Sequence, residues 1–337
     1  SNGSLTDVHD DVLHGTVTID DLTFDGTLDL IAGDLDIDTG ADRNTLAVSD
    51  RASTDGDTAT ITHSSIIGMA AGDITYRSSG GDLAGQGKWA LEGDAGLFGR
   101  GITIHAGTGA DDITIHSVLG EAVGDSALQM VITTLYANDG GDDVFITAPD
   151  VAEALLVVYG ENGDDEINAQ DGEDEAGAVA AAGLELILLG NDGNDEIKGG
   201  SNDDILIGDD GRVILFDDGA GFDVILGGNP VAIPDNVLPG GTALGQNQTD
   251  DGEFETIDVV FSLYEPDADE ATDNDDDNDD IIRGGDGDDL VIGGIGDDGL
   301  DGENDRDVVI GDQGVFTRHV PGASSTVRTL AGETLYD

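Results

Sequence analysis

Residues 275 to 310 read DDDNDDIIR, GGDGDDLVI, GGIGDDGLD and GENDRDVVI, which are nine-residue units laid end to end. Each unit has an aspartate at its sixth position, namely Asp280, Asp289, Asp298 and Asp307. Each also has a branched apolar residue at its eighth position. These residues are Ile282, Val291, Leu300 and Val309. A repeat this short indicates a structure built by stacking many small, similar turns.

Within one unit, the pattern predicts a tight loop followed by a very short strand. The glycines permit positive φ angles and close backbone approach, so the first six residues can turn sharply. The oxygens of such a loop suit Ca²⁺, which accepts about 6 to 8 oxygen ligands at about 2.3 to 2.6 Å. A single unit cannot bury its apolar residue alone. The units are therefore expected to stack into a coil that shares a core and a row of ions.

This stretch resembles the glycine- and aspartate-rich nonapeptide repeat, G-G-x-G-x-D-x-U-x, of bacterial RTX proteins. The resemblance implies a calcium-bound parallel β-roll in which two units make one turn. Units two apart would then share an ion, so Asp280 would pair with Asp298, and Asp289 with Asp307. The first unit lacks the family's glycines and the fourth keeps only Gly302, so the two middle units match the family best.

A second dense run starts at Gly190 and reads GNDGNDEIK, GGSNDDILI, GDDGRVILF and, after one inserted residue, DGAGFDVIL. Its sixth positions are Asp195, Asp204, Val213 and Asp223, and its eighth positions are Ile197, Leu206, Leu215 and Ile225. The apolar series therefore survives where the acidic series breaks, at Val213. We expect the coil to continue through that unit with its core intact and one ion site lost or remodelled.

Three weaker copies of the unit lie far apart in the sequence. They start at residues 106, 137 and 160 and place Asp111, Asp142 and Asp165 at the sixth position. An isolated copy has no partner beside it in the sequence to complete a calcium shell. An acidic glycine turn and a metal site therefore remain equal alternatives for these three copies.

The residue types and their spacing define a set of candidate calcium ligands. They are Asp111, Asp142, Asp165, Asn191, Gly193, Asp195, Gly200, Asn202, Asp204, Gly221, Asp223, Asp280, Gly285, Gly287, Asp289, Gly294, Gly296, Asp298 and Asp307.

The remaining sequence also favours β structure. Short alternating segments at 17–19, 22–24, 28–30, 35–37, 46–48, 59–61 and 74–76 have the period of two that is typical of strands. We therefore predict an all-β fold, a parallel β-solenoid that contains calcium β-roll blocks. The expected division is a short-strand solenoid region (1–105), a solenoid with isolated nonapeptide-like turns (106–189), a first calcium β-roll block (190–228), an acidic, proline-containing β insertion (229–274), a second calcium block (275–314) and the start of a further repeat (315–337).

A longer repeat is also visible. The sequence ILIGDDG at 205–211 recurs as VVIGDQG at 308–314, each time at the end of a dense run. The recurrence fits a large tandem protein. The chain starts without Met and ends mid-pattern, so we expect it to be a piece of a longer protein.

The charge excludes several classes of partner. Asp and Glu number 74 against 11 Lys and Arg, which gives a formal net charge of -63. A nucleic acid or an anionic membrane would be repelled by this field. Divalent cations would relieve the self-repulsion. Adaptation to high salt is an alternative cause of the acidity, but it does not explain carboxylates at every sixth position of nine. There is no cysteine, so disulfides and thiolate metal sites are absent, and no apolar run is long enough to span a membrane.

Motifs of common enzymes are missing from the sequence. There is no H-E-x-x-H for zinc and no G-x-S-x-G for a serine nucleophile. The segment at Gly85 to Trp89 has the wrong spacing for a phosphate-binding loop. We therefore expect no catalytic site in this chain.

The leading functional hypothesis is structural. The sequence predicts a secreted, cell-surface β-solenoid of a large bacterial adhesin, matrix protein or filament that folds on Ca²⁺ binding after export. Its expected partners are calcium ions, with further copies of itself or cell-surface material as candidates. Two alternatives stay open: the non-catalytic repeat region of a secreted RTX-type enzyme, or a solenoid that binds a glycan or ice.

Overall fold

The computed structural model describes residues 26–28, 31–39, 44–78, 98, 101–120, 131–149, 154–170, 182–215, 224–226, 237–238, 242–243, 259–262, 278–312, 315–317, 327–330 and 333–336. All secondary-structure elements within these ranges are β-strands, so the predicted all-β fold is confirmed. Within the same ranges, no helix is long and apolar enough to cross a membrane. The predicted segments at 35–37, 46–48, 59–61 and 74–76 all form strands, whereas 17–19, 22–24 and most of 28–30 lie outside the described residues.

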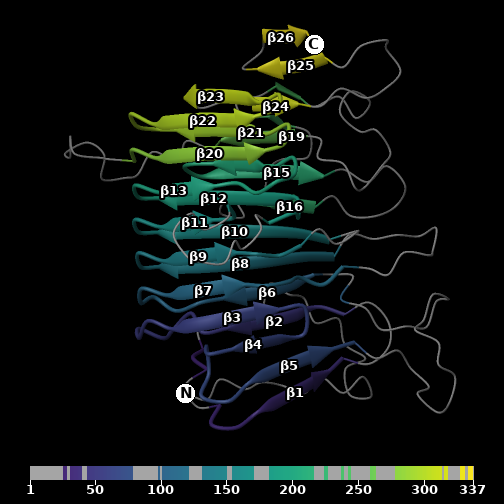
Figure 1. The fold of residues 1–337 in the computed structure, drawn as a ribbon, viewed down its shortest axis with the longest axis vertical. Coiled ribbons are helices and arrows are strands. Elements are labelled where there is room, and N and C mark those ends of the chain that lie inside the picture. The colour runs from purple at the N-terminus through teal and green to yellow at the C-terminus, as the bar shows by residue number, and fades with distance from the viewer. Residues whose placement is uncertain are drawn as a thin grey trace, which may run out of the picture.

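Two large sheets face each other along the length of the molecule (Figure 1). Sheet 1 has the strand order β1 (Leu35–Asp38), β5 (Ile74–Arg77), β4 (Ser65–Ile67), β3 (Thr58–Thr62), β7 (Asp112–Ile115), β9 (Asp143–Ile146), β11 (Glu166–Asn168), β13 (Glu196–Lys198), β20 (Ile281–Asp286) and β22 (Gly299–Asn304). Sheet 2 has the order β2 (Leu46–Ser49), β6 (Ile102–His105), β8 (Val131–Asp139), β10 (Ala154–Asn162), β12 (Leu186–Asp192), β14 (Ile205–Ile207), β21 (Leu290–Gly294) and β23 (Val308–Asp312).

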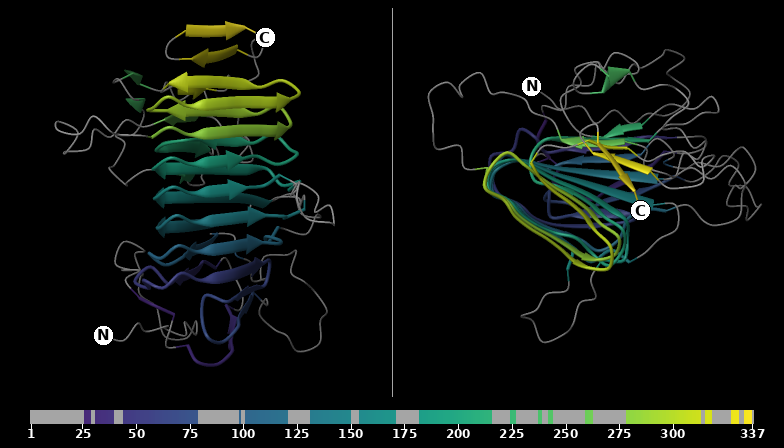
Figure 2. Two further views of the ribbon diagram at one scale, coloured as in Figure 1. Left: turned by 60° about the vertical axis from the view of Figure 1, so that its left-hand side comes forward. Right: turned by 90° about the horizontal axis from the view of Figure 1, so that it is seen from above.

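The chain alternates between these sheets and so forms a parallel β-solenoid. It passes from β6 to β7, then β8 to β9, β10 to β11 and β12 to β13, and each strand pairs in parallel with the one a full turn later. Seen along the long axis, successive turns lie over one another (Figure 2). The N-terminal end of sheet 1 differs, because β3, β4 and β5 pair in an antiparallel manner.

The core between the sheets is made by the apolar residues of the repeat. The eighth-position residues on sheet 1 stand opposite one another in the strand register, and all of them except Leu300 at the end of the column are fully buried. In order they are Ile113, Val144, Ile167, Ile197, Ile282 and Leu300. The prediction that this position faces inward is therefore confirmed. Val309, on the last strand of sheet 2, is 46% exposed because no described strand follows it.

The unit at 208–216 does not continue the coil, and that prediction is wrong. Strand β15 (Gly211–Leu215) leaves the solenoid and pairs antiparallel with β16 (Val224–Leu226) and β19 (Val259–Ser262). The solenoid resumes at β20, which pairs directly with β13, while β21 pairs directly with β14. The two dense runs are therefore contiguous in space, although the chain between them makes a long excursion.

The excursion contributes to a third sheet on the side of the solenoid. This sheet 3 has the order β16, β15, β19, β24 (Val315–Thr317), β25 (Val327–Leu330) and β26 (Glu333–Tyr336), and a separate hairpin joins β17 (Val237–Leu238) to β18 (Thr242–Ala243). The recurring sequences at 205–211 and 308–314 end β14 and β23 and lead into β15 and β24, which both flank β19. Both copies of that sequence therefore mark the same exit from sheet 2 to sheet 3.

Sheet 3 covers the outer face of sheet 2. Val213 of β15 is fully buried in a second apolar cluster with Ile187, Ile207 and Ile292 of sheet 2. A Cβ on Gly211 would lie 2.5 Å from the Ile207 side chain, so the two sheets approach closely here. Sheet 2 is consequently buried on both faces in these turns, which explains its continuous apolar strands.

Candidate cation-binding corners

Aspartates of the repeat form a continuous ladder where the chain turns from sheet 2 to sheet 1. The backbone N–H of each aspartate donates to Oδ1 of the aspartate one turn later. We call this series the long ladder; it consists of Asp111, Asp142, Asp165, Asp195, Asp280 and Asp298. The N–O distances are 2.7 to 2.8 Å up to Asp280 and 3.1 Å at the last step. Asp57 extends the ladder downward, because its N–H donates to Asp111 Oδ1 over 2.6 Å.

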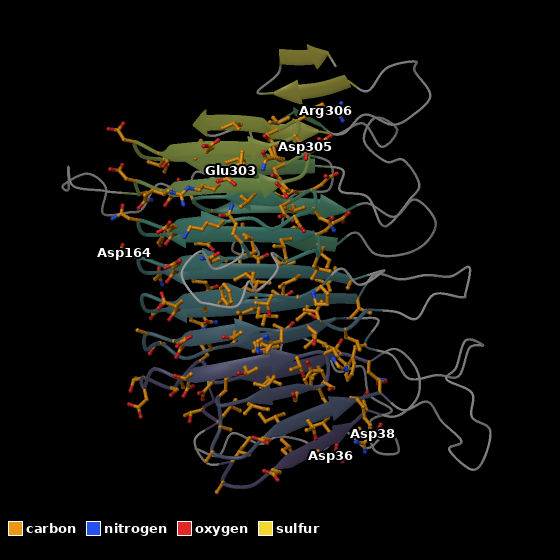
Figure 3. All side chains as sticks on the ribbon, in the orientation of Figure 1. Asp36, Asp38, Asp164, Glu303, Asp305 and Arg306 are labelled. Carbon is orange, nitrogen blue, oxygen red and sulfur yellow. The ribbon has the colours of Figure 1, made fainter. Side chains whose placement is uncertain are left out.

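The long ladder corrects the view that three of the units are isolated. Consecutive members are 31, 23, 30, 85 and 18 residues apart in sequence, yet they are neighbours in space. Asp111, Asp142 and Asp165 therefore each have a partner from the adjacent turn. The turns at this corner stack along one edge of the molecule, which carries the labelled Asp164 (Figure 3).

A short ladder lies at the opposite corner, where the chain turns from sheet 1 to sheet 2. Asp204, Asp289 and Asp307 form it, with N–O distances of 2.8 Å and 3.1 Å between consecutive members. The dense runs are therefore the turns in which both corners carry the repeat. Asp280 lies beside Asp298, and Asp289 beside Asp307, one turn apart, as the resemblance implied. The ions themselves stay a prediction.

The ladder carboxylates are buried, and several have one oxygen without a partner. The exposed fraction is 3% or less at Asp142, Asp165, Asp195, Asp280 and Asp289. In each of the five, Oδ1 accepts the ladder hydrogen bond, while Oδ2 has no hydrogen-bond partner. A buried carboxylate oxygen without a partner costs free energy unless a proton or a cation neutralises it.

Glycine at the first position of a unit keeps the space beside this oxygen open. A Cβ on Gly190 would lie 2.1 Å from Asp195 Oδ2 and 2.4 Å from the carbonyl oxygen of Gly208. At Gly160 the corresponding oxygens belong to Asp165 and Gly190, at 2.3 and 2.6 Å. The same arrangement recurs at Gly208, Gly284 and Gly293. An aspartate oxygen and a glycine carbonyl of the next turn thus converge beside each of these glycines.

Burial raises the pKa of the ladder carboxyls. The pKa rises to about 8 for Asp142 and Asp280, to about 7 for Asp195 and to about 6 for Asp165 and Asp289, chiefly because burial penalises the charged form. Neighbouring carboxylates add to the shift, whereas the ladder hydrogen bonds oppose it. Burial also raises the pKa of Asp204 and Asp111. Without a bound cation, burial therefore disfavours the charged form of the ladder aspartates.

This donor set fits a hard divalent cation in part of the solenoid. All converging atoms are oxygens, the kind of ligand that Ca²⁺ prefers. Among the described residues, no group of three or more Asp, Glu or His side chains could hold a metal ion. A cation at a corner would therefore take at most two carboxylates, with carbonyl oxygens as the remaining protein ligands.

Two of the candidate aspartates fit less well. Asp111 Oδ2 accepts the N–H of Gly107 at 3.0 Å, and Asp204 Oδ2 accepts the N–H of Gly200 at 2.7 Å, so both oxygens of each carboxylate already have partners. The amide nitrogen of Asn202 donates to the carbonyl of Gly183. The first-position residue before Asp111 is Ala106 rather than glycine.

The other candidates fall into three groups. Gly193, Gly285, Gly287, Gly294 and Gly296 have positive φ angles between 110° and 138°, so they shape the turns as predicted. Asp298 and Asp307 are only half-buried because they lie in the last turns of the ladders. Gly221 and Asp223 lie outside the described residues.

One nine-residue unit is split by the excursion and was not predicted from the sequence. A Cβ on Gly208 would lie 2.0 Å from Asp280 Oδ2 and 2.5 Å from Gly293 O, as in an unbroken unit. Gly208 is thus the first position of a unit whose sixth position is Asp280 rather than Val213. The available signal was that residues 208–210 followed by 278–283 spell the complete unit GDDNDDIIR.

Comparison with known proteins gives no relative: no protein-family model, no curated protein and no solved structure matches the chain.

Proposed function

We propose that this chain is an extracellular, calcium-stabilised β-solenoid segment of a large bacterial surface protein of the RTX type, used as an adhesin stalk, matrix component or filament. The observation that carries the proposal is the row of buried aspartates whose Oδ2 atoms lack a hydrogen-bond partner and face a glycine carbonyl of the next turn. Neighbouring strands lie about 4.8 Å apart, so an ion midway between oxygens of adjacent turns would be about 2.4 Å from each. That distance matches the length of Ca²⁺–oxygen bonds.

The two corners would use the same kinds of ligand, an aspartate carboxylate and a glycine carbonyl oxygen. At the long ladder, Asp165, Asp195 and Asp280 would hold the ions together with the carbonyl oxygens of Gly190, Gly208 and Gly293, respectively. At the short ladder, Asp289 would act with the carbonyl oxygen of Gly302. The bound cation would supply positive charge to carboxylates whose charged form burial disfavours.

Folding would then depend on the compartment. The chain carries a formal charge of -63, so uncompensated carboxylates oppose compaction where free Ca²⁺ is scarce. Extracellular calcium modules have dissociation constants of about 10⁻⁴ to 10⁻³ M, so they are filled outside the cell and empty within it. Ion binding to the folded state alone stabilises that state by mass action.

The test is far-UV circular dichroism and thermal unfolding with millimolar Ca²⁺ and with a chelator. We expect Ca²⁺ to raise the β signal and the melting temperature, and the chelator to reverse both changes. NaCl at matched ionic strength is the control, because general screening of an acidic surface would stabilise the chain equally well. The proposal fails if the spectrum and melting temperature are the same in Ca²⁺ and chelator, or if NaCl reproduces the whole calcium effect.

A further inference from the structure

A second column of polar side chains runs beside the long ladder. Asn138, Glu161 and Asn191 occupy the second position of their units and stand opposite one another on β8, β10 and β12. All three have left-handed backbone, with φ of 76°, 75° and 76°. This conformation costs a residue with a Cβ roughly 1–2 kcal/mol, and the nonapeptide normally has glycine here. A glutamate in this position therefore calls for a role of its side chain.

The amide oxygen of Asn191 lacks a partner although the side chain is buried. Asn191 is 9% exposed, and its Oδ1 has no hydrogen-bond partner. Its Nδ2 donates to Asp210 Oδ1 over 2.5 Å, which turns the nitrogen toward the turn that follows β14. Because the two amide atoms diverge from the same carbon, the oxygen is not the atom that faces Asp210. Glu161 is the residue of β10 in register with Asn191.

Charges of both signs act on Glu161. Burial raises the pKa of Glu161, and the carboxylates of Asp139 and Asp210 raise it further. Arg51 opposes the shift through its charge, but the structure records no ion pair between these two described side chains. Burial and the two carboxylates thus disfavour the charged form of Glu161, whereas Arg51 favours it.

We propose that Glu161 and Asn191 bind a divalent cation, with Ca²⁺ the best match, at a site separate from the two aspartate ladders. The strand spacing of about 4.8 Å lets an ion between the two turns lie about 2.4 Å from an oxygen of each. That distance is normal for Ca²⁺. Glu161 supplies charge, and Asn191 supplies a neutral oxygen. The site uses second-position side chains, whereas the ladders use sixth-position aspartates and glycine carbonyls, so it does not rest on the proposed function.

Asn138 stands opposite Glu161 on the turn before. Its Nδ2 donates to the carbonyl of Ala106 at 2.7 Å, and its Oδ1 has no hydrogen-bond partner although the side chain is buried. Asn138 is therefore a candidate for a second neutral oxygen beside Glu161.

Two tyrosines make the site observable. Tyr136 and Tyr159 stack with ring centroids 4.7 Å apart, and Tyr159 precedes Glu161 by two residues on the same strand. Two residues of strand span about 7 Å. Tb³⁺, a lanthanide substitute for Ca²⁺, emits when an excited aromatic ring lies this close. Titration of the full chain with Tb³⁺ and detection of tyrosine-sensitised emission is therefore the experiment.

The variants are chosen to preserve the backbone. Glu161→Gln keeps the shape and removes the charge, and Asn191→Gly removes the amide oxygen at a φ angle that glycine adopts freely. We expect Glu161→Gln to weaken one class of Tb³⁺ sites by roughly tenfold or more, and Asn191→Gly by several-fold, since affinity follows ligand charge and number. The matched control is Glu303→Gln, since Glu303 is also a second-position residue with positive φ, but it is exposed and accepts a hydrogen bond from Gln170 at 3.0 Å. Its titration should equal that of the wild type.

Three results would overturn the site. The first is a Glu161→Gln titration that superimposes on the wild-type curve. The second is an equal loss in Glu303→Gln. The third is a lower melting temperature of Glu161→Gln in chelator, because Glu161 would then be a structural partner of Arg51 rather than a cation ligand.

The ladder variant Asp195→Asn separates this inference from the proposed function. A loss of all tyrosine-sensitised sites in Asp195→Asn, with none in Glu161→Gln, would sink the new site and leave the ladder proposal standing. A loss of Tb³⁺ sites in Glu161→Gln alone would support the new site and count against the ladder proposal. Distinct losses in the two variants would support both.

Discussion

The two corners of the solenoid use the same aspartate hydrogen bond but differ in how regular they are. The long ladder runs without a gap from Asp111 to Asp298. The short ladder has only Asp204, Asp289 and Asp307, in the last turns. Below Asp204, the segments that return the chain from sheet 1 to sheet 2 vary in length, as from β7 to β8 or from β11 to β12.

This difference shows that one regular corner is sufficient to keep the turns in register. A strand that slipped by one residue would turn its apolar side chains outward, so the register must be fixed at least once per turn. The long ladder does this from β7 onward, and the opposite corner is free to accept insertions. Even the excursion between Gly208 and Asn278, which interrupts the long ladder's own corner, leaves Asp195 bonded to Asp280.

The largest effect should come from a methyl group placed in the regular corner. Gly163 has φ of 141°, and a Cβ there would lie 1.4 Å from the carbonyl oxygen of Gly140 on the turn before. Gly163→Ala must therefore push two turns apart and should cost more than about 3 kcal/mol in urea unfolding in the presence of Ca²⁺. Gly33→Ala is the control, since a Cβ at Gly33 meets nothing within 4 Å and should change stability by less than about 0.5 kcal/mol. Equal stabilities would show that the turns are not packed as described.

The second prediction concerns pH in the absence of calcium. The folded-state pKa values of Asp142, Asp195 and Asp280 are raised to between about 7 and about 8, above the unfolded value of about 3.9. The folded state therefore binds more protons than the unfolded state across that interval, and stability must fall as pH rises from about 4 to 8. Thermal unfolding in chelator should show a steady drop in melting temperature.

In Ca²⁺ the melting temperature should stay constant or rise over the same pH range, because metal binding requires deprotonated ligands. A chelated protein whose melting temperature is constant or increases from pH 5 to 8 would mean that the ladder carboxylates are not desolvated.

The third prediction compares two members of the long ladder. Asp195 has an Oδ2 without a hydrogen-bond partner beside Gly190, whereas Asp111 Oδ2 already accepts the N–H of Gly107. Asp195→Asn should raise the calcium concentration needed for half-maximal folding by about three- to tenfold, because the site loses ligand charge. Asp111→Asn should shift it far less. Circular dichroism during a calcium titration measures both, and equal shifts would mean that all turns bind the ion alike.

The fourth prediction concerns a variant that gives the unit of Asp142 the first-position glycine found in the later units. Ala137 stands at the first position of the unit of Asp142, where the turns above have glycine, and Asp142 Oδ2 has no partner. Ala137→Gly should cost about 1 kcal/mol or less in chelator, and it should enlarge the stabilisation by Ca²⁺. Ala148→Gly, which removes another buried methyl group away from the ladder, is the matched control. A calcium effect that grows equally in both variants would exclude a role for the first-position methyl group.

Much of this fold could be read from the sequence because its signal is local. The spacing of sixth- and eighth-position residues predicted the inward column and the glycine turns, and the family resemblance implied that Asp280 lies beside Asp298. The pairing of Asp142 with Asp165 could not be read in the same way, since loop length hides which turns are adjacent. When each turn contains only one unit, the units look isolated in the sequence. They become neighbours only when successive turns stack.

The exit at Gly208 was missed for a different physical reason. The strand at Val213 is apolar and follows a good unit, so periodicity alone assigns it to the core between the sheets. Its side chain is buried instead in the second cluster, on the outer face of sheet 2. A buried strand has the same composition on either side of a sheet, and local pattern does not distinguish them.

The smallest effect on calcium-dependent folding should come from the largest change in sequence, the removal of the excursion. Deleting residues 211–277 joins Asp210 to Asn278 and produces the regular unit GDDNDDIIR, with Gly208 at the first position and Asp280 at the sixth. Since the long ladder already connects Asp195 to Asp280, the calcium midpoint of this variant should stay within about twofold of the wild type, well under the tenfold that 1.4 kcal/mol would produce. The deletion also removes β15 and β19, so binding of an apolar dye to the uncovered face of sheet 2 should increase. Deleting 211–278 instead is the matched control, because a single further residue moves Asp280 from the sixth to the fifth position and turns Ile282 away from the core. If both deletions keep the wild-type midpoint, the sixth-position aspartates do not set the register; if both lose it, the excursion rather than the ladder holds the two dense runs together.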